Sequence, residues 1–258
     1  MDIHPSALVD PQAELAEDVF IRPYCVIGPH VSIGSGSVIG PHVVIDGWTA
    51  IGTGNRIYPF TSIGHAPQDL SYAGEQTRVV IGDNNIIREY VSIHRGTPRG
   101  GGTTRIGNNN YIMTSVHIAH DCVLGDSVIM ASGATLGGHV HIDDHAIVGG
   151  LVAIHQFVRI GTGAYIGGLS GVGQDVPPYT LIAGEHARLR GLNLVGLKRR
   201  ELSVKTVQAL KKAYKILFRS NHMLRDAIQE VRDELESLPE IDNLLHFVEQ
   251  ESNRGITR

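Results

Sequence analysis

Residues 106–142 read IGNNNYIMTSVHIAHDCVLGDSVIMASGATLGGHVHI, and an aliphatic side chain returns there at every sixth position. The period continues without a slip to residue 172. Its members are Ile106, Ile112, Ile118, Leu124, Met130, Leu136, Ile142, Val148, Ile154, Ile160, Ile166 and Val172. Neither a helix of about 3.6 residues per turn nor a long strand of period two keeps this register, whereas short strands joined by tight corners do. The stretch therefore predicts a mainly β fold, a parallel β-solenoid.

The same period begins at Ile3 and continues through Ile63, so no separate domain is expected in front of it. It lapses near residues 64–80 and again near 96–105, where we expect two loops thrown outward from the solenoid. The step from Ile93 to Ile106 is seven residues longer than one unit. Loops on a rigid scaffold often carry function, although a tolerated insertion is the plain alternative.

The pattern ends at Pro177-Pro178, and well over half of the lysines and arginines lie after residue 187. We therefore predict a solenoid over residues 1–178 and a helical domain over 179–258. Apolar periodicity, with Ser203 as a cap, predicts helices over about 203–220, 222–237 and 241–250, and Pro239 is expected to mark a break. The helices are expected to cover the open end of the solenoid, where edge backbone would otherwise be exposed.

Composition narrows the class of protein. The 258-residue chain has a formal charge of −4, which gives no case for nucleic acid as a partner. It has no signal-like start and no apolar run long enough for a transmembrane segment, so a cytoplasmic location is expected. Cys25 and Cys122 occupy small inward positions of the repeat, and we expect reduced core residues rather than a disulfide or metal pair.

Several of the 14 histidines cluster in the middle of the repeat. If three six-residue sides form one coil, residues 18 apart lie above one another at a strand spacing of about 4.8 Å. The expected neighbours are His120 with Gly138 and Gln156, Asp121 with His139, and His94 with Ala119 if seven extra residues loop out. Three interpretations stay open from the residues alone: a polar face with corner histidines, a metal site, and a general base near neutral pH.

A family resemblance rests on motifs spread along the whole chain. They are Gln68-Asp69-Leu70, Ile93-His94-Arg95-Gly96-Thr97, His117-Ile118-Ala119-His120-Asp121, Gly138-His139-Val140, His155-Gln156-Phe157, Gln174-Asp175-Val176-Pro177-Pro178-Tyr179 and Gly196-Leu197-Lys198-Arg199-Arg200. With them the chain closely resembles the UDP-N-acetylglucosamine acyltransferases, which catalyse the first step of lipid A biosynthesis. Six-residue repeats are shared by many acyltransferases, so the ordered histidine motifs and the helical tail carry the specificity. The resemblance implies a left-handed β-helix and a homotrimer with active sites between neighbouring subunits. No metal or other cofactor is expected.

The resemblance also implies roles for residues. His120 resembles the general base that deprotonates the sugar's 3-substituent as it attacks the thioester of a 3-hydroxyacyl acyl carrier protein. Gly138 resembles the backbone N–H donor to the oxyanion, and Asp121 a residue that orients its neighbours, with surface solvation as the alternative. Residues that resemble contacts to the UDP-sugar or the acyl donor are Gln68, Asp69, Ser71, His94, His117, His139, His155, Gln156, Asn193, Arg199 and Arg200.

Two positions depart from the family pattern, which has lysine where this chain has Ser71 and glutamate where it has Val195. We therefore hypothesise that the acceptor is a 3-amino analogue of the sugar nucleotide, giving an amide, with neutral drift as the alternative. Gly168 matches the position that acts as an acyl-chain ruler, and His186 matches a residue at the far end of the groove. Glycine leaves that slot open, so a longer hydroxyacyl chain is expected.

The basic tail is expected to dock acyl carrier protein, which is acidic. Its cations are Arg188, Arg190, Lys198, Arg199, Arg200, Lys205, Lys211, Lys212 and Lys215. Four other functions remain open: the related enzyme that N-acylates glucosamine, a coenzyme A-dependent acetyltransferase, a metal-dependent hydratase of the same fold, and a non-catalytic scaffold. The first of these resembles a longer chain with a uridine-binding domain in front, whereas the repeat here starts at Ile3.

Overall fold

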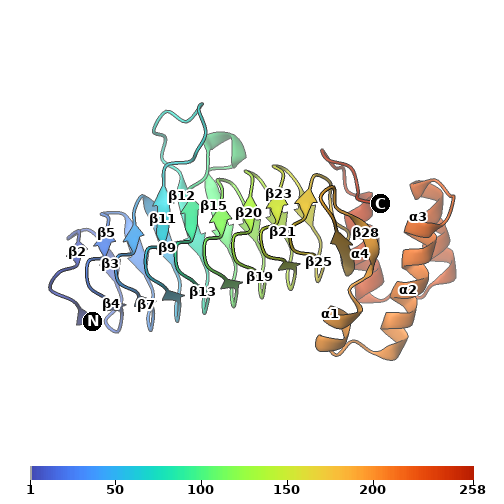
Figure 1. The fold of residues 1–258 in the computed structure, drawn as a ribbon, viewed down its shortest axis with the longest axis horizontal. Coiled ribbons are helices and arrows are strands. Elements are labelled where there is room, and N and C mark those ends of the chain that lie inside the picture. Colours follow the sequence, from blue (N-terminus) through green and yellow to red (C-terminus); the bar gives the residue numbers. More distant parts are fainter. Residues whose placement is uncertain (1) are drawn as a thin grey trace.

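The computed structural model describes residues 2–258 and shows a long three-sided β-helix followed by helices (Figure 1). Short strands stack in three sheets, which we name A, B and C. Sheet A consists of β1 (Asp2–Ile3), β4 (Phe20–Ile21), β7 (Val38–Ile39), β10 (Arg56–Ile57), β13 (Ile86–Ile87), β16 (Tyr111–Ile112), β19 (Ile129–Met130), β22 (Ile147–Val148), β25 (Tyr165–Ile166), β27 (Thr180–Ala183) and β28 (Arg188–Leu192). All neighbours are parallel except the terminal hairpin of β27 and β28.

The other two sheets are wholly parallel. Sheet B consists of β2 (Leu8–Val9), β5 (Val26–Ile27), β8 (Val44–Ile45), β11 (Ser62–His65), β14 (Ser92–His94), β17 (His117–Ile118), β20 (Thr135–Leu136), β23 (Ala153–Ile154) and β26 (Gly171–Val172). Sheet C consists of β3 (Glu14–Leu15), β6 (Val31–Ile33), β9 (Trp48–Ile51), β12 (Arg78–Ile81), β15 (Thr103–Ile106), β18 (Val123–Leu124), β21 (His141–Ile142) and β24 (Arg159–Ile160).

A coil takes 18 residues along most of the β-helix, which confirms the predicted register. Ile118 pairs with Leu136 in sheet B. Two coils are longer: Asn55 bonds to Asn85, 30 residues away, and Ser92 to His117, 25 residues away. The additional residues form a loop over 66–77, between β11 and β12, and a loop over 95–102, between β14 and β15, which contains the 3-10 turn η1 (Pro98–Gly100). Both loops leave the β-helix on the same side (Figure 1).

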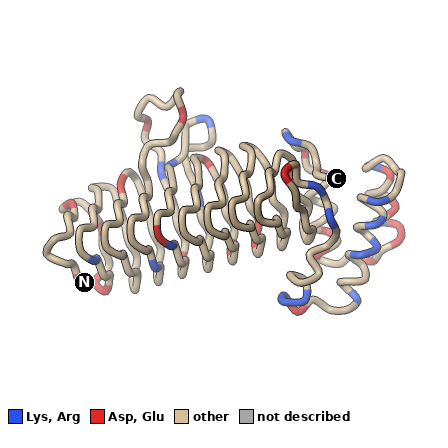
Figure 2. The backbone as a smooth tube through the Cα atoms, viewed as in Figure 1, with Lys and Arg blue, Asp and Glu red and all other residues tan. Residues whose placement is uncertain are grey.

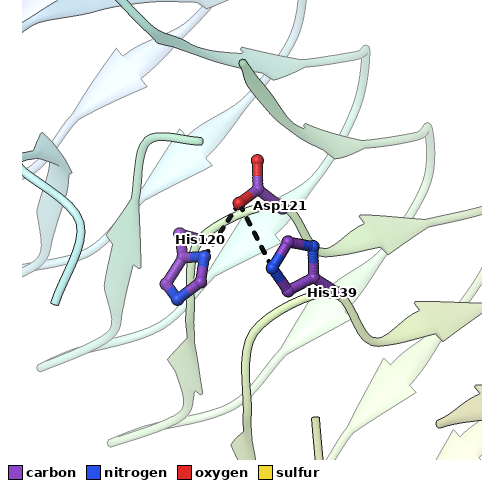
Figure 3. A group of neighbouring side chains, drawn as sticks. All are labelled: His120, Asp121 and His139. Atoms are coloured by element: carbon purple, nitrogen blue, oxygen red, sulfur yellow. Dashed lines mark hydrogen bonds and ion pairs between the residues drawn. The ribbon is translucent and has the colours of Figure 1, made fainter. Parts of the chain in front are cut away.

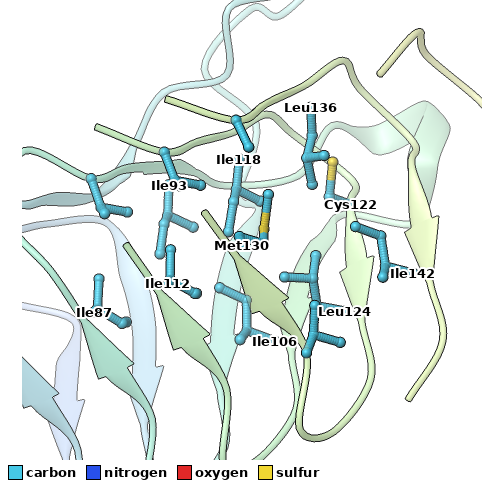
Figure 4. Packing of buried hydrophobic residues seen from close by; sticks show 14 of the residues in the cluster. Ile87, Ile93, Ile106, Ile112, Ile118, Cys122, Leu124, Met130, Leu136 and Ile142 are labelled. Carbon is cyan, nitrogen blue, oxygen red and sulfur yellow. The ribbon is translucent and has the colours of Figure 1, made fainter. Parts of the chain in front are cut away.

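The six-residue series fills the interior of the β-helix (Figure 4). Leu124, Met130 and Leu136 are at most 1 % exposed, because each side of a coil points one large aliphatic residue inward. Cys25 and Cys122 are free thiols in this core, as predicted. Burial raises the pKa of the Cys122 thiol to about 12.

The corners between sheets form three edges of the prism, which we name by their sheets. The BC edge carries Asp121, His139 and Phe157, the CA edge carries Ser127, His145 and Gly163, and the AB edge carries Ser115, Leu151 and Leu169. All of these corner residues have a positive φ, which is 60° at Asp121 and 61° at His139. Such corners are costly for most side chains, but aspartate and histidine tolerate them better than most.

The tail consists of α1 (Leu194–Arg199), α2 (Val204–Arg219), α3 (Leu224–Glu234) and α4 (Pro239–Glu249). The last three confirm the predicted helices, and the Ser203 hydroxyl accepts from the Thr206 N–H at 3.0 Å as a cap. The expected break at Pro239 is confirmed, because α3 ends at Glu234 and Pro239 is the first residue of α4, where its missing N–H costs nothing. Helix α1 and the β27–β28 hairpin were not expected from the periodicity.

The two ends of the β-helix differ. At the carboxyl end, Leu189 and Tyr214 are buried against its core, so the tail covers the last coil. At the amino end, Ile3 is 36 % exposed. Lysines and arginines gather on the tail (Figure 2). Of the helices within residues 2–258, none combines the length and apolar character needed to cross a bilayer.

Candidate active site

The densest cluster of ionisable side chains lies on the BC edge and consists of His120, Asp121 and His139 (Figure 3). His120 and Asp121 follow β17 at the corner where the chain turns from sheet B to sheet C. The His120 Nδ1 atom lies 2.8 Å from the Asp121 Oδ2 atom, and the His139 Nε2 atom lies 3.8 Å from the same oxygen. The predicted pairing of Asp121 with His139 across one coil is thus observed.

Asp121 is not a solvated surface residue. Its side chain is 1 % exposed. Its carboxylate accepts from the Thr97 N–H at 2.8 Å and from the Thr97 hydroxyl at 2.6 Å, and its own N–H donates to the Thr104 hydroxyl oxygen at 2.8 Å. A buried carboxylate needs such donors, since an ion without partners in a low-dielectric interior is very costly. The solvation alternative for this residue is therefore wrong.

Gly138 lies directly against the imidazole of His120. A β-carbon added to Gly138 would be 2.5 Å from the His120 Cε1 atom and 2.7 Å from the Nε2 atom, distances that real β-carbons do not reach. The φ of Gly138 is not positive, so the glycine is required for space rather than for an unusual backbone conformation. Gly138 is buried, and its N–H donates to no acceptor among residues 2–258. A buried N–H without a partner is rare and marks a place where a ligand oxygen can bind.

Further histidines extend this wall in both directions. The His139 ring stacks on Phe157 with a centroid distance of 4.4 Å. On the other side, the His117 Nδ1 atom is 2.8 Å from the Ser92 hydroxyl, and the His94 Nδ1 atom is 2.7 Å from the Ala66 carbonyl oxygen. Burial is the main cause that lowers the pKa of both His117 and His139. These imidazoles therefore favour the neutral form, which suits hydrogen bonding to a polar ligand.

The loop over 66–77 brings Asp69 toward the same wall. The Ser71 N–H and hydroxyl both donate to the Asp69 Oδ1 atom at 2.8 Å, and these bonds lower the pKa of the Asp69 carboxyl. Arg95 anchors the loop, because its Nε and Nη2 atoms donate to the Tyr72 hydroxyl at 3.2 and 3.0 Å. The two loops that leave the β-helix are thereby joined beside His120.

The distances within the cluster suit a hydrogen bond better than a shared metal ion. Ligand atoms lie about 2.0–2.2 Å from zinc and stay more than about 3 Å from one another around a tetrahedral ion. The Nδ1 and Oδ2 atoms of His120 and Asp121 are only 2.8 Å apart, and the same oxygen accepts from the Thr97 hydroxyl. The pair therefore favours the acid–base interpretation of the wall.

Other predicted site residues lie at other edges of the same chain. The Asn193 side chain is buried and bonds to the Gly196 N–H and to the Gly163 carbonyl oxygen, and an Arg200 nitrogen lies beside Gly163, so both residues are at the CA edge. Gly168 precedes Leu169 on the AB edge. Arg199 is exposed on α1, His186 is exposed between β27 and β28, and Gln68, His155 and Gln156 are exposed near the BC edge. One chain therefore gathers the histidines and Asp69, but not the cations of the tail.

Sequence reasoning assigned no role to Thr97, Thr104 or Phe157. The signal for Thr97 was present, since it closes the motif Ile93-His94-Arg95-Gly96-Thr97. The sequence did not show what Thr97 contacts, because the loop has no six-residue period from which the position of the threonine could be counted. Phe157 was detectable, since it lies 18 residues after His139.

A left-handed β-helix of six-residue repeats with a histidine–aspartate pair at one edge defines a hexapeptide-repeat transferase. Residues 12–47 and 103–138 match the bacterial transferase hexapeptide family, and residues 175–257 match the family described as UDP N-acetylglucosamine O-acyltransferase, domain 2. The chain belongs to the UDP-N-acetylglucosamine O-acyltransferase family.

Similarity to individual members extends over the full length. The chain is 58 % identical to the acyl-[acyl-carrier-protein]–UDP-N-acetylglucosamine O-acyltransferase of Syntrophobacter fumaroxidans, with 100 % of both chains covered. It is 57 % identical to that of Thermodesulfovibrio yellowstonii, over 100 % of this chain and 99 % of the relative. The crystal structure of the UDP-N-acetylglucosamine O-acyltransferase from Moraxella catarrhalis superimposes with a TM-score of 0.96 at 44 % identity and full coverage of both chains.

Proposed function

We propose that this protein transfers a 3-hydroxyacyl chain from acyl carrier protein to the 3-position of UDP-N-acetylglucosamine, the first step of lipid A biosynthesis. The observation that carries the chemistry is the His120–Asp121 pair beside the unpartnered N–H of Gly138. An acyl transfer needs a base for the nucleophile and a donor for the oxyanion, and both lie here within one corner of the β-helix.

The proposed mechanism uses each of these groups once. The Asp121 carboxylate accepts from the Thr97 N–H and hydroxyl, and as an acceptor toward His120 it places the proton on Nδ1 and leaves a lone pair on Nε2. Nε2 takes the proton of the sugar's 3-hydroxyl while that oxygen attacks the thioester carbonyl. The Gly138 N–H stabilises the negative charge on the carbonyl oxygen. Collapse of the tetrahedral intermediate breaks the C–S bond, and the imidazolium returns the proton to the sulfur of the carrier thiol.

A homotrimer is the second part of the proposal. His120 and His139 lie at the BC edge, Asn193 and Arg200 at the CA edge, and Gly168 at the AB edge. Side chains on different edges of one rigid prism cannot meet around a single substrate. Packing of three prisms side by side would place different edges across one cleft, and closed cyclic assemblies of this kind are common. Analytical ultracentrifugation measures the assembly state, and a transfer assay measures the activity. A protein that is monomeric and fully active would contradict this assembly. The cytoplasmic location expected from the sequence stays a prediction.

The tail supplies a surface for acyl carrier protein. Lys205 and Lys212 are paired with Glu236 and Glu234. By contrast, no carboxylate of residues 2–258 lies within ion-pair distance of Lys198, Lys211 or Lys215. Unpaired cations on an exposed face raise the encounter rate with an acidic partner in a salt-dependent way.

A 3-amino sugar nucleotide is the second candidate acceptor. The Ser71 hydroxyl is bonded to Asp69 near His120, and Val195 is 63 % exposed at the start of α1, so neither position offers a charge to the acceptor.

The acyl chain is expected to be long. A β-carbon at Gly168 would lie 3.2 Å from the Gly150 carbonyl oxygen and would narrow the surface that glycine leaves open.

One experiment tests the proposed function, the choice of acceptor sugar and the preferred length of the acyl donor. The purified protein is incubated with a panel of 3-hydroxyacyl carrier proteins of different lengths and with either the 3-hydroxy or the 3-amino sugar nucleotide, and products are identified by mass spectrometry. We expect one acylated UDP-sugar and a preference for long donors. Absence of transfer from every donor would contradict the proposed function. Elemental analysis of the same sample tests the metal-dependent alternative, which requires a stoichiometric ion.

A further inference from the structure

We infer that Thr97 is a positioning residue for the acyl transfer, which holds the Asp121 carboxylate aligned as a hydrogen-bond acceptor so that His120 keeps its proton on Nδ1. The inference rests on the proposed function, because it concerns the same histidine–aspartate pair. It gives the loop over 95–102 a defined task in that function.

Thr97 contacts both oxygens of the Asp121 carboxylate. Its N–H donates to Oδ1 at 2.8 Å and its hydroxyl lies 2.6 Å from Oδ2. Two bonds from one residue prevent rotation of the carboxylate about its terminal bond. Both residues are buried, with Thr97 only 2 % exposed, so water does not compete for these positions.

The direction of each hydrogen bond follows from the neighbours. The Gly100 N–H donates to the Thr97 hydroxyl oxygen at 3.3 Å. The hydroxyl proton is therefore free for Asp121 Oδ2, which acts as an acceptor. Since Oδ2 also lies 2.8 Å from His120 Nδ1, the imidazole is the donor in that bond. The chain of donors fixes the tautomer that leaves Nε2 as a base.

The loop is shaped around the carboxylate. A β-carbon added to Gly96 would overlap the Thr103 nitrogen and lie 2.7 Å from the Asp121 Oδ1 atom, and one added to Gly100 would overlap the carboxyl group. Neither glycine has a positive φ, so space and not backbone conformation requires them. Glycines on both sides of Thr97 thus allow the threonine to approach closely enough to bond both oxygens.

A purely structural role for Thr97 is the competing explanation, because the same hydroxyl caps η1. The two roles make different kinetic predictions. A residue that acts through Asp121 changes the chemical step, whereas a residue that only holds the loop alters substrate binding and stability. The effect of a positioning residue also disappears once Asp121 is removed, since residues that act as one unit are not additive.

The test compares Thr97→Val with Thr61→Val, which removes an equally buried hydroxyl that donates to the Arg88 carbonyl oxygen away from the site. Hydrogen bonds to charged groups are worth enough for Thr97→Val to lower kcat by about 10- to 100-fold. We expect KM to stay within about twofold, Thr97→Ser to restore kcat to within about threefold, and Thr61→Val to leave both constants unchanged. In the Asp121→Ala background, Thr97→Val is expected to lower kcat by less than about twofold.

A second readout does not depend on activity. In protein labelled with nitrogen-15 histidine, the chemical shifts of the His120 ring report which nitrogen carries the proton, and the signals are assigned by their loss in His120→Gln. We expect the Nδ1–H tautomer in the natural protein and in Thr97→Ser, and a mixture in Thr97→Val. An unchanged tautomer, or a full additional loss of kcat in the Asp121→Ala background, would overturn the inference. If the natural protein catalyses no acyl transfer but Thr97→Val still changes the His120 tautomer, only the proposed reaction is overturned.

Discussion

Two histidine–carboxylate pairs of nearly equal geometry occupy opposite environments in this molecule. The His120 Nδ1 atom lies 2.8 Å from Asp121 at the BC edge, and the His222 Nδ1 atom lies 2.7 Å from Glu230 on the helical tail. The side chains of the first pair are 13 % and 1 % exposed, whereas those of the second are 54 % and 32 % exposed.

The comparison shows that two histidine–carboxylate pairs with nearly the same contact distance can differ in burial and in the neighbours that hold them. Water screens the pair on the tail, and such exposed pairs contribute about 0–1 kcal/mol to stability. The buried pair has a carboxylate held by two further donors, a glycine against the ring, and a free N–H beside it. These neighbours restrict the orientation of the imidazole, and in the proposed mechanism the free N–H beside it receives the reacting carbonyl oxygen.

The largest expected effect is the removal of each imidazole in turn. His120→Ala should lower kcat/KM by about 100- to 10,000-fold, the range for loss of a general base. His222→Ala should leave kcat/KM unchanged, because its pair lies on the tail and is exposed. Steady-state kinetics with circular dichroism as a folding control makes the measurement. Equal effects of the two variants would contradict the distinction between the buried and the exposed pair. An unchanged kcat/KM in His120→Ala would do the same and would support the scaffold alternative.

The next effect concerns the glycine that admits the buried ring. Gly138→Ala places a methyl group where the His120 imidazole lies, and a displacement of about 1 Å at a catalytic group can cost about 100-fold in rate. Gly173→Ala is the matched control, since an added β-carbon there has no atom within 4 Å. The measurement is kcat for both variants. Normal turnover by Gly138→Ala would show that the ring does not need this space.

A smaller effect is expected from the loop over 66–77, which carries Asp69 toward His120. Tyr72→Phe removes the hydroxyl that accepts hydrogen bonds from Arg95. Loss of a hydrogen bond to a neutral hydroxyl should change KM by about two- to tenfold. The loss should raise the KM of the sugar nucleotide, because Asp69 and Ser71 belong to that loop, while kcat changes less. Tyr58→Phe is the control, as the Tyr58 ring lies under Arg88 and outside the loop. A kcat effect without a KM effect would contradict this assignment.

The smallest effect is a pH dependence of stability. Burial lowers the pKa of His117 in the folded protein below its ordinary value of 6.5, so the unfolded chain binds a proton more readily. The stabilising contribution of the neutral imidazole is complete above about pH 6.5 and is lost as the pH falls through the lowered value. Thermal unfolding of His117→Gln should therefore depend less on pH between about 7 and 5 than that of the natural protein. Parallel curves for the two proteins would contradict the shift.

Much of the fold was predictable because it is periodic. The six-residue series from Ile106 to Val172 determines which residues point inward, and the 18-residue coil then places His120 next to Gly138 and Asp121 next to His139. The helices of the tail were predictable from amphipathic spacing and the Ser203 cap. Helix α1 was not, since its six residues are too few to show a period.

The sequence by itself determined the coil, its core and the edge shared by His120, Asp121 and His139, because the constant period of the repeat gives each residue its place in the coil. Only the tertiary structure decided that Asp121 is buried, that Thr97 bonds both of its oxygens, and that Arg95 joins the two loops through Tyr72. Those contacts depend on how loops of irregular length fold back onto the prism. A loop has no period, so its end points are set by steric fit and hydrogen bonding in three dimensions.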